Sequence, residues 1–234
     1  MKAVILAGGK GTRLKPYTTS IPKPLVPIGE KAIIDILINR LKNAGVDEVF
    51  ICVNHLAEII MAFLGDGKKF GIKINYSFEK KPLSTIAPLK LIKNLPDDFL
   101  VMNGDLLTDL DFKKLFLNHI KSKAQLTVST YKRKVKIDFG VIEVDKKGSN
   151  AVGFLEKPEY NYEVAMGVNV INKKLLKLIP EDTSFGFDNL MNMMLKKNEK
   201  INIFRYNGYW LDIGRPDDYE KANNDVEKLK HLLK

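Results

Sequence analysis

Two cations follow a glycine-rich loop near the start of the chain, and this pattern could bind phosphate. The stretch LAGGKGTRLKPYTTSIPKP runs from Leu6 to Pro24, and its glycines are Gly8, Gly9 and Gly11. Because glycine has no Cβ and tolerates positive φ, the backbone N–H groups of such a loop can surround an anion. Arg13 offers a planar fork for phosphate oxygens, and Lys23 offers a point charge on a segment stiffened by its neighbouring prolines. The stretch therefore predicts a cradle for a diphosphate or triphosphate.

Alternating strands and helices would position this loop. Apolar runs and helical spacing predict strands at 2–6, 48–53, 72–78 and 99–103, with helices at 33–44, 58–64 and 88–95. Such alternation is typical of an α/β fold, here a Rossmann-like, mostly parallel sheet flanked by helices. Ligands of these folds bind at the carboxyl ends of the strands, where both the glycine loop and the Gly104-Asp105 pair are expected.

The second half of the chain has a different order of predicted strands and helices. Strands are expected at 126–131, 140–144 and 151–155, of which the last two form a small antiparallel β insertion, and then at 164–171 and 201–206. Short helical segments are expected at 174–178 and after Asp188, where Met191, Met193 and Met194 should fill the core, and a last helix at 216–233. We interpret residues 1–234 as a single domain, with a nucleotide-binding half at 1–123 and a sugar-phosphate-binding half at 124–234.

Composition narrows the class of protein. The formal net charge of +10 over 234 residues suits an anionic partner. The lysines are dispersed, without the aromatic-interleaved tract that grips nucleic acid, so nucleic acid stays a minor alternative. The single cysteine, Cys52, lies in an apolar run and indicates a reducing compartment. No signal peptide or membrane-spanning run is evident, so a cytoplasmic protein without membrane contact is expected.

The glycine loop matches neither of the two commonest phosphate loops. A Walker loop needs Ser or Thr directly after Gly-Lys, but Gly11 follows Lys10, and a dinucleotide fingerprint needs a third glycine where Leu14 stands. The pattern G-G-x-G-T-R-L followed by P-K-P instead resembles the signature of the sugar-1-phosphate nucleotidyltransferases, also called nucleoside-diphosphate-sugar pyrophosphorylases. Within this family, the chain most resembles the short members that are mannose- and heptose-1-phosphate guanylyltransferases.

Further motifs extend this resemblance along the chain in the family's order. VMNGDLLTDLDF resembles the strand that ends in a metal-binding aspartate, here Asp105, and GYWLDIGRPDDY resembles the segment that completes the metal site with Asp212. FLEKP and AMGVNVI resemble the sugar-phosphate-binding segments, which implies such roles for Glu156, Lys157 and Gly167. The implied nucleotide-binding residues are Leu6, Ala7, Gly8, Gly9, Gly11, Thr12, Arg13, Glu79, Pro82, Ser84, Thr85, Asn103 and Gly104.

The resemblance implies an enzyme that joins a nucleoside triphosphate and a sugar 1-phosphate into a nucleotide sugar, with release of pyrophosphate. Two anions must approach each other, so such a site needs Mg²⁺ on carboxylates and cations aimed at phosphates. Asp105 and Asp212 would hold Mg²⁺, and the catalytic residues would be Arg13, Lys23 and Asp105. The implied pathway is nucleotide-sugar biosynthesis for cell-surface polysaccharide.

Three departures from the family pattern leave the substrates open. The family's loop commonly reads Pro-Leu-Gly-Thr-Ala-Gly, but here Ser84 and Ala87 replace the glycines, and Ala165 replaces a frequent asparagine. We therefore expect a reshaped loop near Glu79. Arg215 also replaces a threonine of the Asp212 segment. GTP with a mannose- or heptose-type sugar is favoured. The alternatives are a UTP- or dTTP-dependent transferase and a catalytically weak regulatory subunit that binds nucleotide sugars.

Several other residues are expected to be structural. His55, His119 and His231 fall on or beside predicted surface elements, so no catalytic or metal role is assigned to them. Of Asp109 and Asp111, one should cap the next helix. A homodimer is one option if the antiparallel insertion exposes an apolar patch.

Overall fold

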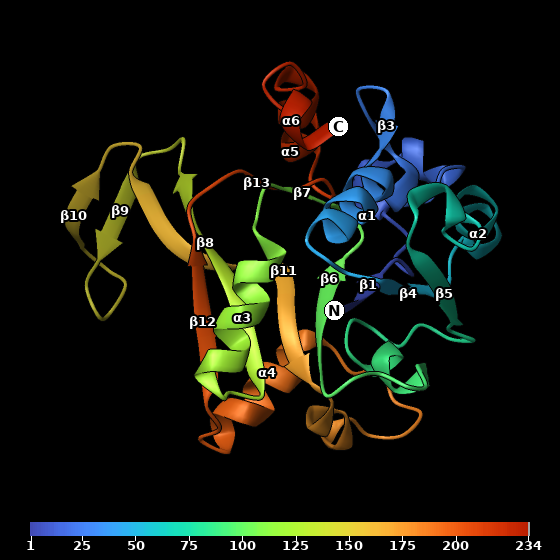
Figure 1. The fold of residues 1–234 in the computed structure, drawn as a ribbon. Coiled ribbons are helices and arrows are strands. Elements are labelled where there is room, and N and C mark those ends of the chain that lie inside the picture. Colours follow the sequence, from blue (N-terminus) through green and yellow to red (C-terminus); the bar gives the residue numbers. More distant parts are fainter. Residues whose placement is uncertain (234) are drawn as a thin grey trace.

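A seven-stranded sheet runs through the computed structural model, which describes residues 1–233 apart from the side chains of residues 231 and 233 (Figure 1). The strand order is β12-β8-β11-β6-β1-β4-β5. Four of the six pairings are parallel, and only β11 pairs antiparallel with its neighbours β6 and β8. The predicted α/β fold with a mostly parallel sheet is confirmed. The strands are β1 (Lys2–Leu6), β4 (Glu48–Val53), β5 (Lys73–Phe78), β6 (Asp98–Asn103), β8 (Leu126–Lys136), β11 (Glu159–Asn172) and β12 (Ile201–Tyr206).

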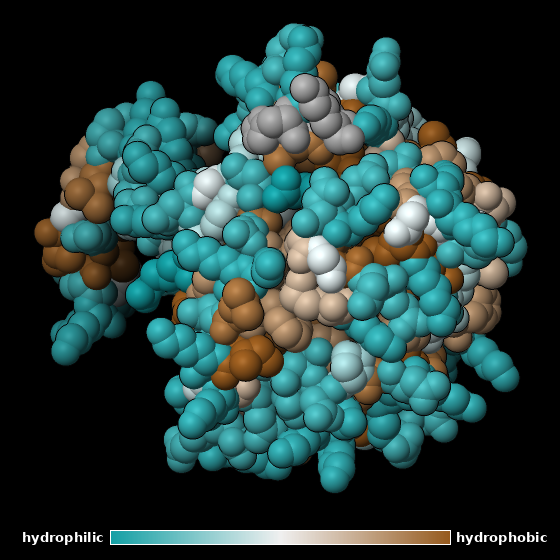
Figure 2. All heavy atoms as spheres, in the orientation of Figure 1, coloured by the Kyte–Doolittle hydropathy of each residue, from teal (hydrophilic) through white to brown (hydrophobic). Residues whose placement is uncertain are grey.

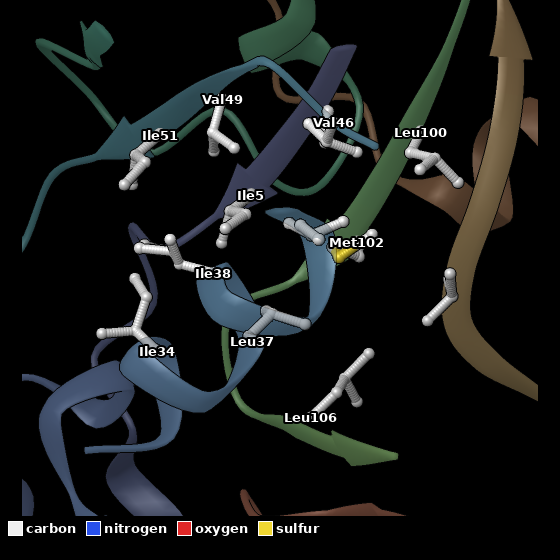
Figure 3. Packing of buried hydrophobic residues seen from close by; sticks show 14 of the residues in the cluster. Ile5, Ile34, Leu37, Ile38, Val46, Val49, Ile51, Leu100, Met102 and Leu106 are labelled. Atoms are coloured by element: carbon white, nitrogen blue, oxygen red, sulfur yellow. The ribbon is translucent and has the colours of Figure 1, made fainter. Parts of the chain in front are cut away.

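One face of the sheet is covered by helices α1 (Ile33–Asn43), α2 (Ala57–Leu64) and α3 (Phe112–Ser122). Figure 3 shows Ile34, Leu37 and Ile38 of α1 facing the side chains of Ile5 and Ile51 on the sheet. All five are at most 1% exposed, and burying each such side chain contributes about 1.5–3 kcal/mol. This packing fixes the carboxyl ends of β1 and β4 relative to each other.

The opposite face is covered by α4 (Phe187–Lys196) and by the segments before it. Met194 of α4 is fully buried there, and Met191 and Met193 pack against the same cluster, so their predicted core role is confirmed. Cys52 is also fully buried on this face, and burial raises the pKa of its thiol. The predicted inert core role of this cysteine agrees with that environment.

Shorter elements connect the two halves of the chain. β7 (Leu106–Thr108) pairs antiparallel with β13 (Trp210–Asp212), and β2 (Pro27–Ile28) pairs with β3 (Lys31–Ala32). Asp111 caps α3, since its side chain accepts from the Lys114 N–H, as expected for one of the two acids. The remaining short turns are 3-10 helices at Thr12–Leu14, Tyr17–Thr19, Lys23–Leu25, Lys68–Phe70, Ala87–Leu91 and Lys173–Leu178.

A two-stranded arm projects from the side of the sheet. β9 (Val141–Val144) and β10 (Ala151–Leu155) form an antiparallel hairpin, as predicted, and Figure 1 shows it at the end of the extended β8 and β11. Figure 2 shows hydrophobic atoms on this projecting lobe. The exposed apolar side chains of the arm include Ile142, Val144, Val152 and Phe154.

Two predicted helices are shorter than expected. The expected helix at 88–95 is only a 3-10 turn, Ala87–Leu91, because the Ile86 and Ala87 N–H groups bond to the Phe185 carbonyl and Asn94 has a positive φ. The expected helix at 216–233 is broken into α5 (Pro216–Asn224) and α6 (Lys230–Leu233). Two asparagines of low helix propensity end α5, and Val226 in the break packs beside Gly29.

The surface position expected for His119 is wrong. This side chain of α3 is 2% exposed, with Nδ1 2.8 Å from Thr127 Oγ1 and Nε2 3.1 Å from Asp98 Oδ1. The apolar face of α3 packs against β8, and the His119 side chain is buried between these two elements. His55 is partly exposed, and the side chain of His231 lies outside the described residues.

An acid at the start of β4 ties three strands together. Glu48 lies opposite Lys2 of β1 and Lys73 of β5, with oxygen to Nζ distances of 2.5 and 2.7 Å, and Asn75 donates to it at 2.9 Å. The two lysine hydrogen bonds lower the pKa of Glu48 from 4.5 to about 2. A lowered folded-state pKa means that the contribution to stability is present above pH 4.5 and is lost as pH falls through about 2.

We therefore expect Glu48→Gln to lower the free energy of unfolding at pH 7 by about 1 kcal/mol, since both lysines are partly exposed. Urea unfolding of both proteins between pH 7 and pH 3 should show this difference shrinking with acid. The exposed substitution Glu220→Gln is the control. A difference that stays constant over this pH range would contradict the assignment.

Within residues 1–233, no helix is long and apolar enough to cross a membrane.

Candidate active site

A cavity of about 480 Å³ opens at the carboxyl ends of β1, β4 and β6. The structure places every predicted nucleotide-binding residue on its wall, together with Lys23, Asp105 and Asp212. The full lining is Leu6, Ala7, Gly8, Gly9, Lys10, Gly11, Thr12, Arg13, Lys23, Pro24, Asn54, Glu79, Pro82, Leu83, Ser84, Thr85, Asn103, Gly104, Asp105 and Asp212. Segments that are far apart in sequence meet at this cavity because the parallel strands before them end at the same edge of the sheet.

Two positions of the glycine loop require glycine. Gly11 has φ +62°, and a Cβ there would lie 2.8 Å from Thr18 Cγ2, whose residue also donates its hydroxyl to the Gly11 carbonyl at 2.7 Å. A Cβ on Gly8 would lie 2.8 Å from Glu79 Oε1. A larger residue at position 11 or position 8 would push the loop away from Thr18 or Glu79, respectively. Glycine at these positions therefore keeps the backbone N–H groups of the loop at the cavity wall.

Two aspartates face two cations in this cavity. Lys23 Nζ contacts Asp105 Oδ2 and lies 4.0 Å from Asp212 Oδ1, while Arg13 lies 3.9 Å from Asp212 Oδ2. Asp105 and Asp212 are adjacent because β7 pairs with β13, and the Ile213 N–H donates to the Asp105 carbonyl at 2.9 Å. Burial lowers the pKa of Lys23, Asp212 opposes this shift, and Arg13 adds to it.

Lys23 is thus a largely buried cation with a second cation, Arg13, nearby. Its side chain is 14% exposed, and the nearby Arg13 repels it. An incoming phosphate would relieve both the desolvation and the repulsion, because it supplies negative charge next to Nζ and to the Arg13 fork. Gly214 leaves room for Lys23, since a side chain at position 214 would overlap Nζ.

Two carboxylates match the way proteins hold Mg²⁺ beside phosphates. Among the described residues, no group of three or more His, Cys, Asp or Glu side chains could enclose a metal. Mg²⁺ is usually bound by one or two carboxylates, with water and substrate phosphates as the other ligands. Asp105 and Asp212 could therefore hold a cation that takes its remaining ligands from water and a bound triphosphate.

Glu79 is a buried acid at the other end of the cavity. It is 5% exposed, its Oε2 accepts from the Leu83 N–H at 3.2 Å, and burial raises its pKa although this hydrogen bond acts in the opposite direction. Asn54 donates its amide to the Glu79 carbonyl at 2.6 Å. Asn54 was missed at the sequence level, and the available signal was its position directly after a buried strand.

The loop that follows Glu79 keeps a glycine-like backbone without glycine. Ser84 has φ +69°, the left-handed conformation that a side chain disfavours. The neighbouring residues are anchored to the start of α4 and the residues just before it: the Phe185 N–H donates to the Leu83 carbonyl at 3.0 Å, and the Phe187 N–H donates to Thr85 Oγ1 at 2.9 Å. The tertiary contacts thus impose the turn on Ser84, which lines the cavity with Thr85.

A second, smaller cavity of about 210 Å³ adjoins the first and shares Leu6, Thr85 and Asn103 with it. Gly167 lines it with φ +74°, and a Cβ there would lie 2.7 Å from Asn103 Nδ2. Asn169 also lines it, is 6% exposed, and has a buried Oδ1 that accepts no hydrogen bond from any residue the structure describes. Sequence reasoning missed Asn169, although a polar residue inside an apolar strand was a usable signal.

The nucleotidyl transferase family model matches residues 2–229. The chain belongs to this nucleotidyl transferase family. It is 35% identical over 94% of its length to a mannose-1-phosphate guanyltransferase from Yarrowia lipolytica, but it spans only 62% of that relative. It is 33% identical to a D-glycero-alpha-D-manno-heptose 1-phosphate guanylyltransferase from Aneurinibacillus thermoaerophilus, with 97% of this chain and 99% of that protein covered.

Two further matches bear on the nucleotide. A UTP–glucose-1-phosphate uridylyltransferase from Synechocystis is 32% identical over 97% of this chain and 63% of its own length. A solved structure of HddC from Yersinia pseudotuberculosis complexed with GMP-PN has a TM-score of 0.73 and 27% identity, covering 96% of this chain and 99% of that one. The family resemblance inferred from the motifs is confirmed.

The nucleotidyl transferase motif FLEKP lies apart from both cavities. Glu156 and Lys157 line neither of them, their side chains are 63% and 57% exposed, and their charged atoms lie 4.0 Å apart. Both residues stand where the projecting arm returns to β11, and Lys157 has φ +44°. Arg215 is exposed and precedes α5 as its N-cap without lining the larger cavity. The structure therefore brings Gly167, but not Glu156 or Lys157, beside the residues predicted to bind the nucleotide.

Proposed function

We propose that the protein transfers a nucleotidyl group from a nucleoside triphosphate to a sugar 1-phosphate and releases pyrophosphate. GTP with a mannose- or heptose-type sugar 1-phosphate is the favoured pair. The observation that carries this proposal is the arrangement of Arg13, Lys23, Asp105 and Asp212 beside the glycine loop in one cavity.

The reaction can be written from these groups. An oxygen of the sugar phosphate attacks the α-phosphorus of the triphosphate, the bond from that phosphorus to the bridging oxygen breaks, and pyrophosphate leaves. The glycine loop and Arg13 would hold the triphosphate, and Lys23 would offset the charge that gathers around the reacting phosphates. Such catalysis by positioning and charge needs no side-chain nucleophile.

Asp105 and Asp212 would hold Mg²⁺ bound with the triphosphate. When present, this ion supplies positive charge that offsets the repulsion between the two phosphates and the charge on the leaving pyrophosphate. Lys23 would then exchange its contact with Asp105 for contacts with phosphate.

Guanine is supported by the chemistry of Glu79 as well as by the names of the relatives. The edge of guanine carries two neighbouring N–H donors, and a carboxylate can accept from both. Binding of these donors would favour the charged form of Glu79, against the burial that raises its pKa. The uridylyltransferase relative supports the alternative of UTP or dTTP.

The smaller cavity is the place we assign to the sugar ring. Its walls combine apolar residues with Thr85, Asn103 and Asn169, a mixture that suits a sugar with both C–H and hydroxyl surface. The unpartnered Oδ1 of Asn169 can accept a hydrogen bond from a sugar hydroxyl. Glu156 and Lys157 remain candidates for the sugar phosphate if the arm moves toward the cavity.

Replacing Asn169 with leucine should separate this role from a structural one. We expect the KM for the sugar 1-phosphate to rise about tenfold, because a hydrogen bond to the sugar is lost, while the KM for the nucleotide stays the same. The free energy of unfolding should stay level or rise, since an unpaired buried polar group is removed. Equal changes in both KM values would contradict the assignment.

The proposed function is tested by one panel of assays. Pyrophosphate release is measured with GTP, UTP, dTTP, CTP and ATP, each against mannose-, heptose-, glucose- and amino-sugar 1-phosphates with Mg²⁺. The highest rate is expected with GTP and a mannose- or heptose-type substrate. A highest rate with UTP or dTTP would favour the alternative transferase.

Binding measurements beside this panel separate the other classes of protein. Binding of nucleotide and sugar phosphate without turnover on every pair would favour a regulatory subunit. Tight nucleic-acid binding that resists moderate salt would favour the alternative of a nucleic-acid-binding protein. Non-specific binding by charge alone would not persist, because it weakens steeply as salt rises. The cytoplasmic location stays a prediction, and so does a homodimer, which the exposed apolar side chains of the arm support.

A further inference from the structure

A partly buried ion pair contacts the backbone of Asp212 without lining either cavity, with side chains that are 25% exposed for Arg133 and 5% exposed for Asp218. Arg133 of β8 donates NH1 to Asp218 Oδ2 at 3.0 Å and NH2 to Asp218 Oδ1 at 2.7 Å. Asp218 belongs to the first turn of α5 and is 4% exposed. Two parallel bonds of this kind fix both partners in one geometry, unlike a loose surface pair.

Asp218 also holds the backbone of Asp212. The Asp212 N–H donates to Asp218 Oδ2 at 3.2 Å, so this oxygen serves both Arg133 and the amide of the candidate metal ligand. On the other side of the same residue, Asp212 Oδ1 accepts from the Gly214 N–H at 2.9 Å. Together these bonds determine the direction in which the Asp212 carboxylate projects toward Arg13 and Lys23.

Arg133 is itself held in place. Its guanidinium carbon lies 5.9 Å from the ring of Trp210, and the Trp210 indole N–H donates to the Met166 carbonyl at 3.0 Å. The hydrogen bonds to Asp218 raise the pKa of Arg133. Because the Arg133 guanidinium lies against both Asp218 oxygens, it offsets the negative charge that Asp218 would otherwise add beside Asp105 and Asp212.

We propose that Asp218 is a positioning residue that, with Arg133, fixes Asp212 for binding the cation that accompanies the triphosphate. The pair also links Asp212 to β8, the strand that leads into the arm carrying Glu156 and Lys157. Asp218 lines neither cavity and would act through Asp212. This role rests on the proposed function where enzyme activity is measured, whereas a measurement of metal binding is independent of it.

The test compares Asp218→Asn with Asp217→Asn. An asparagine at position 218 keeps the shape but turns one acceptor oxygen into a donor, so the two Arg133 N–H groups and the Asp212 N–H can no longer all find an acceptor. Asp217 is exposed in the same helical turn and supplies a matched loss of charge. For Asp218→Asn, the Mg²⁺ concentration for half-maximal activity is expected to rise about ten- to hundredfold. For Asp217→Asn it should stay within about twofold of wild type.

A second readout does not depend on turnover. Binding of Mn²⁺, measured by electron paramagnetic resonance with a GTP analogue that cannot be cleaved between the α- and β-phosphates, should weaken by the same factor in Asp218→Asn. If wild type binds Mn²⁺ with the analogue but releases no pyrophosphate, the proposed function fails while this comparison still tests Asp218. Unchanged Mn²⁺ binding in Asp218→Asn would overturn the positioning role.

The double variant Arg133→Met with Asp218→Leu separates positioning from folding. Apolar replacement of both members of a buried ion pair is often neutral or stabilising, so its unfolding midpoint should stay near that of wild type. The Asp212 N–H still loses its acceptor, and the expected result is a folded protein with weakened Mn²⁺ binding. Wild-type Mn²⁺ binding in this double variant would show that the pair is only structural.

Discussion

Replacing Asp105 with asparagine is expected to lower the rate of pyrophosphate release at least about a hundredfold at saturating GTP, sugar 1-phosphate and Mg²⁺. Asparagine has nearly the same size, so the change removes one negative charge from a residue that is 8% exposed. The candidate cation ligands would fall from two carboxylates to one, and Lys23 would lose its contact with Oδ2. Both losses weaken charge placement around the reacting phosphates.

Asp111→Asn is the matched control for this prediction. Asp111 caps α3 nearby and is exposed, and asparagine caps a helix as well as aspartate does, so its rate should stay within about twofold of wild type. Thermal unfolding of both variants checks that the fold is intact. A folded Asp105→Asn variant with a rate near that of wild type would remove Asp105 from the mechanism.

Replacing Glu79 with glutamine is expected to shift nucleotide preference from GTP toward UTP. Glutamine can still accept the Leu83 N–H, but its NH₂ group would then face the two N–H donors of guanine. Uracil presents a donor flanked by acceptors, which an amide can match. The loss of a hydrogen bond to a charged group should lower the GTP-to-UTP ratio of kcat/KM about ten- to hundredfold.

The control for the nucleotide shift is Glu58→Gln, an exposed residue of α2. The GTP-to-UTP ratio of kcat/KM for Glu58→Gln should stay within about twofold of the wild-type ratio. If Glu79→Gln leaves the GTP-to-UTP ratio unchanged, Glu79 does not contact the base, and the guanine preference must arise elsewhere in the cavity.

Local patterns predicted which segments meet at the larger cavity because two of them directly follow buried strands. The glycine loop follows β1, and the Gly104-Asp105 pair follows β6. In a parallel sheet, strand ends meet at one edge, so the sequence order alone placed these segments together. The positive φ of Gly11 and Gly167 agrees with the use of glycine there.

Contacts between distant segments were not predictable in this way. Arg133 and Asp218 are 85 residues apart, and their pairing depends on the length of β8 and on where α5 begins. The inward position of His119 and the left-handed backbone of Ser84 are likewise imposed by packing against β8 and the segment before α4. The prediction of one helix at 216–233 also missed the break after α5, where Val226 packs beside Gly29.

The central claim is transfer of a nucleotidyl group rather than binding or hydrolysis of the nucleotide. The most direct measurement is mass spectrometry of products from wild-type protein incubated with GTP, mannose 1-phosphate or a heptose 1-phosphate, and Mg²⁺, with pyrophosphate measured in parallel. Equal amounts of GDP-sugar and pyrophosphate are predicted, with neither product in the absence of sugar phosphate. Pyrophosphate accompanied by GMP, or no product despite bound GTP, would contradict the account.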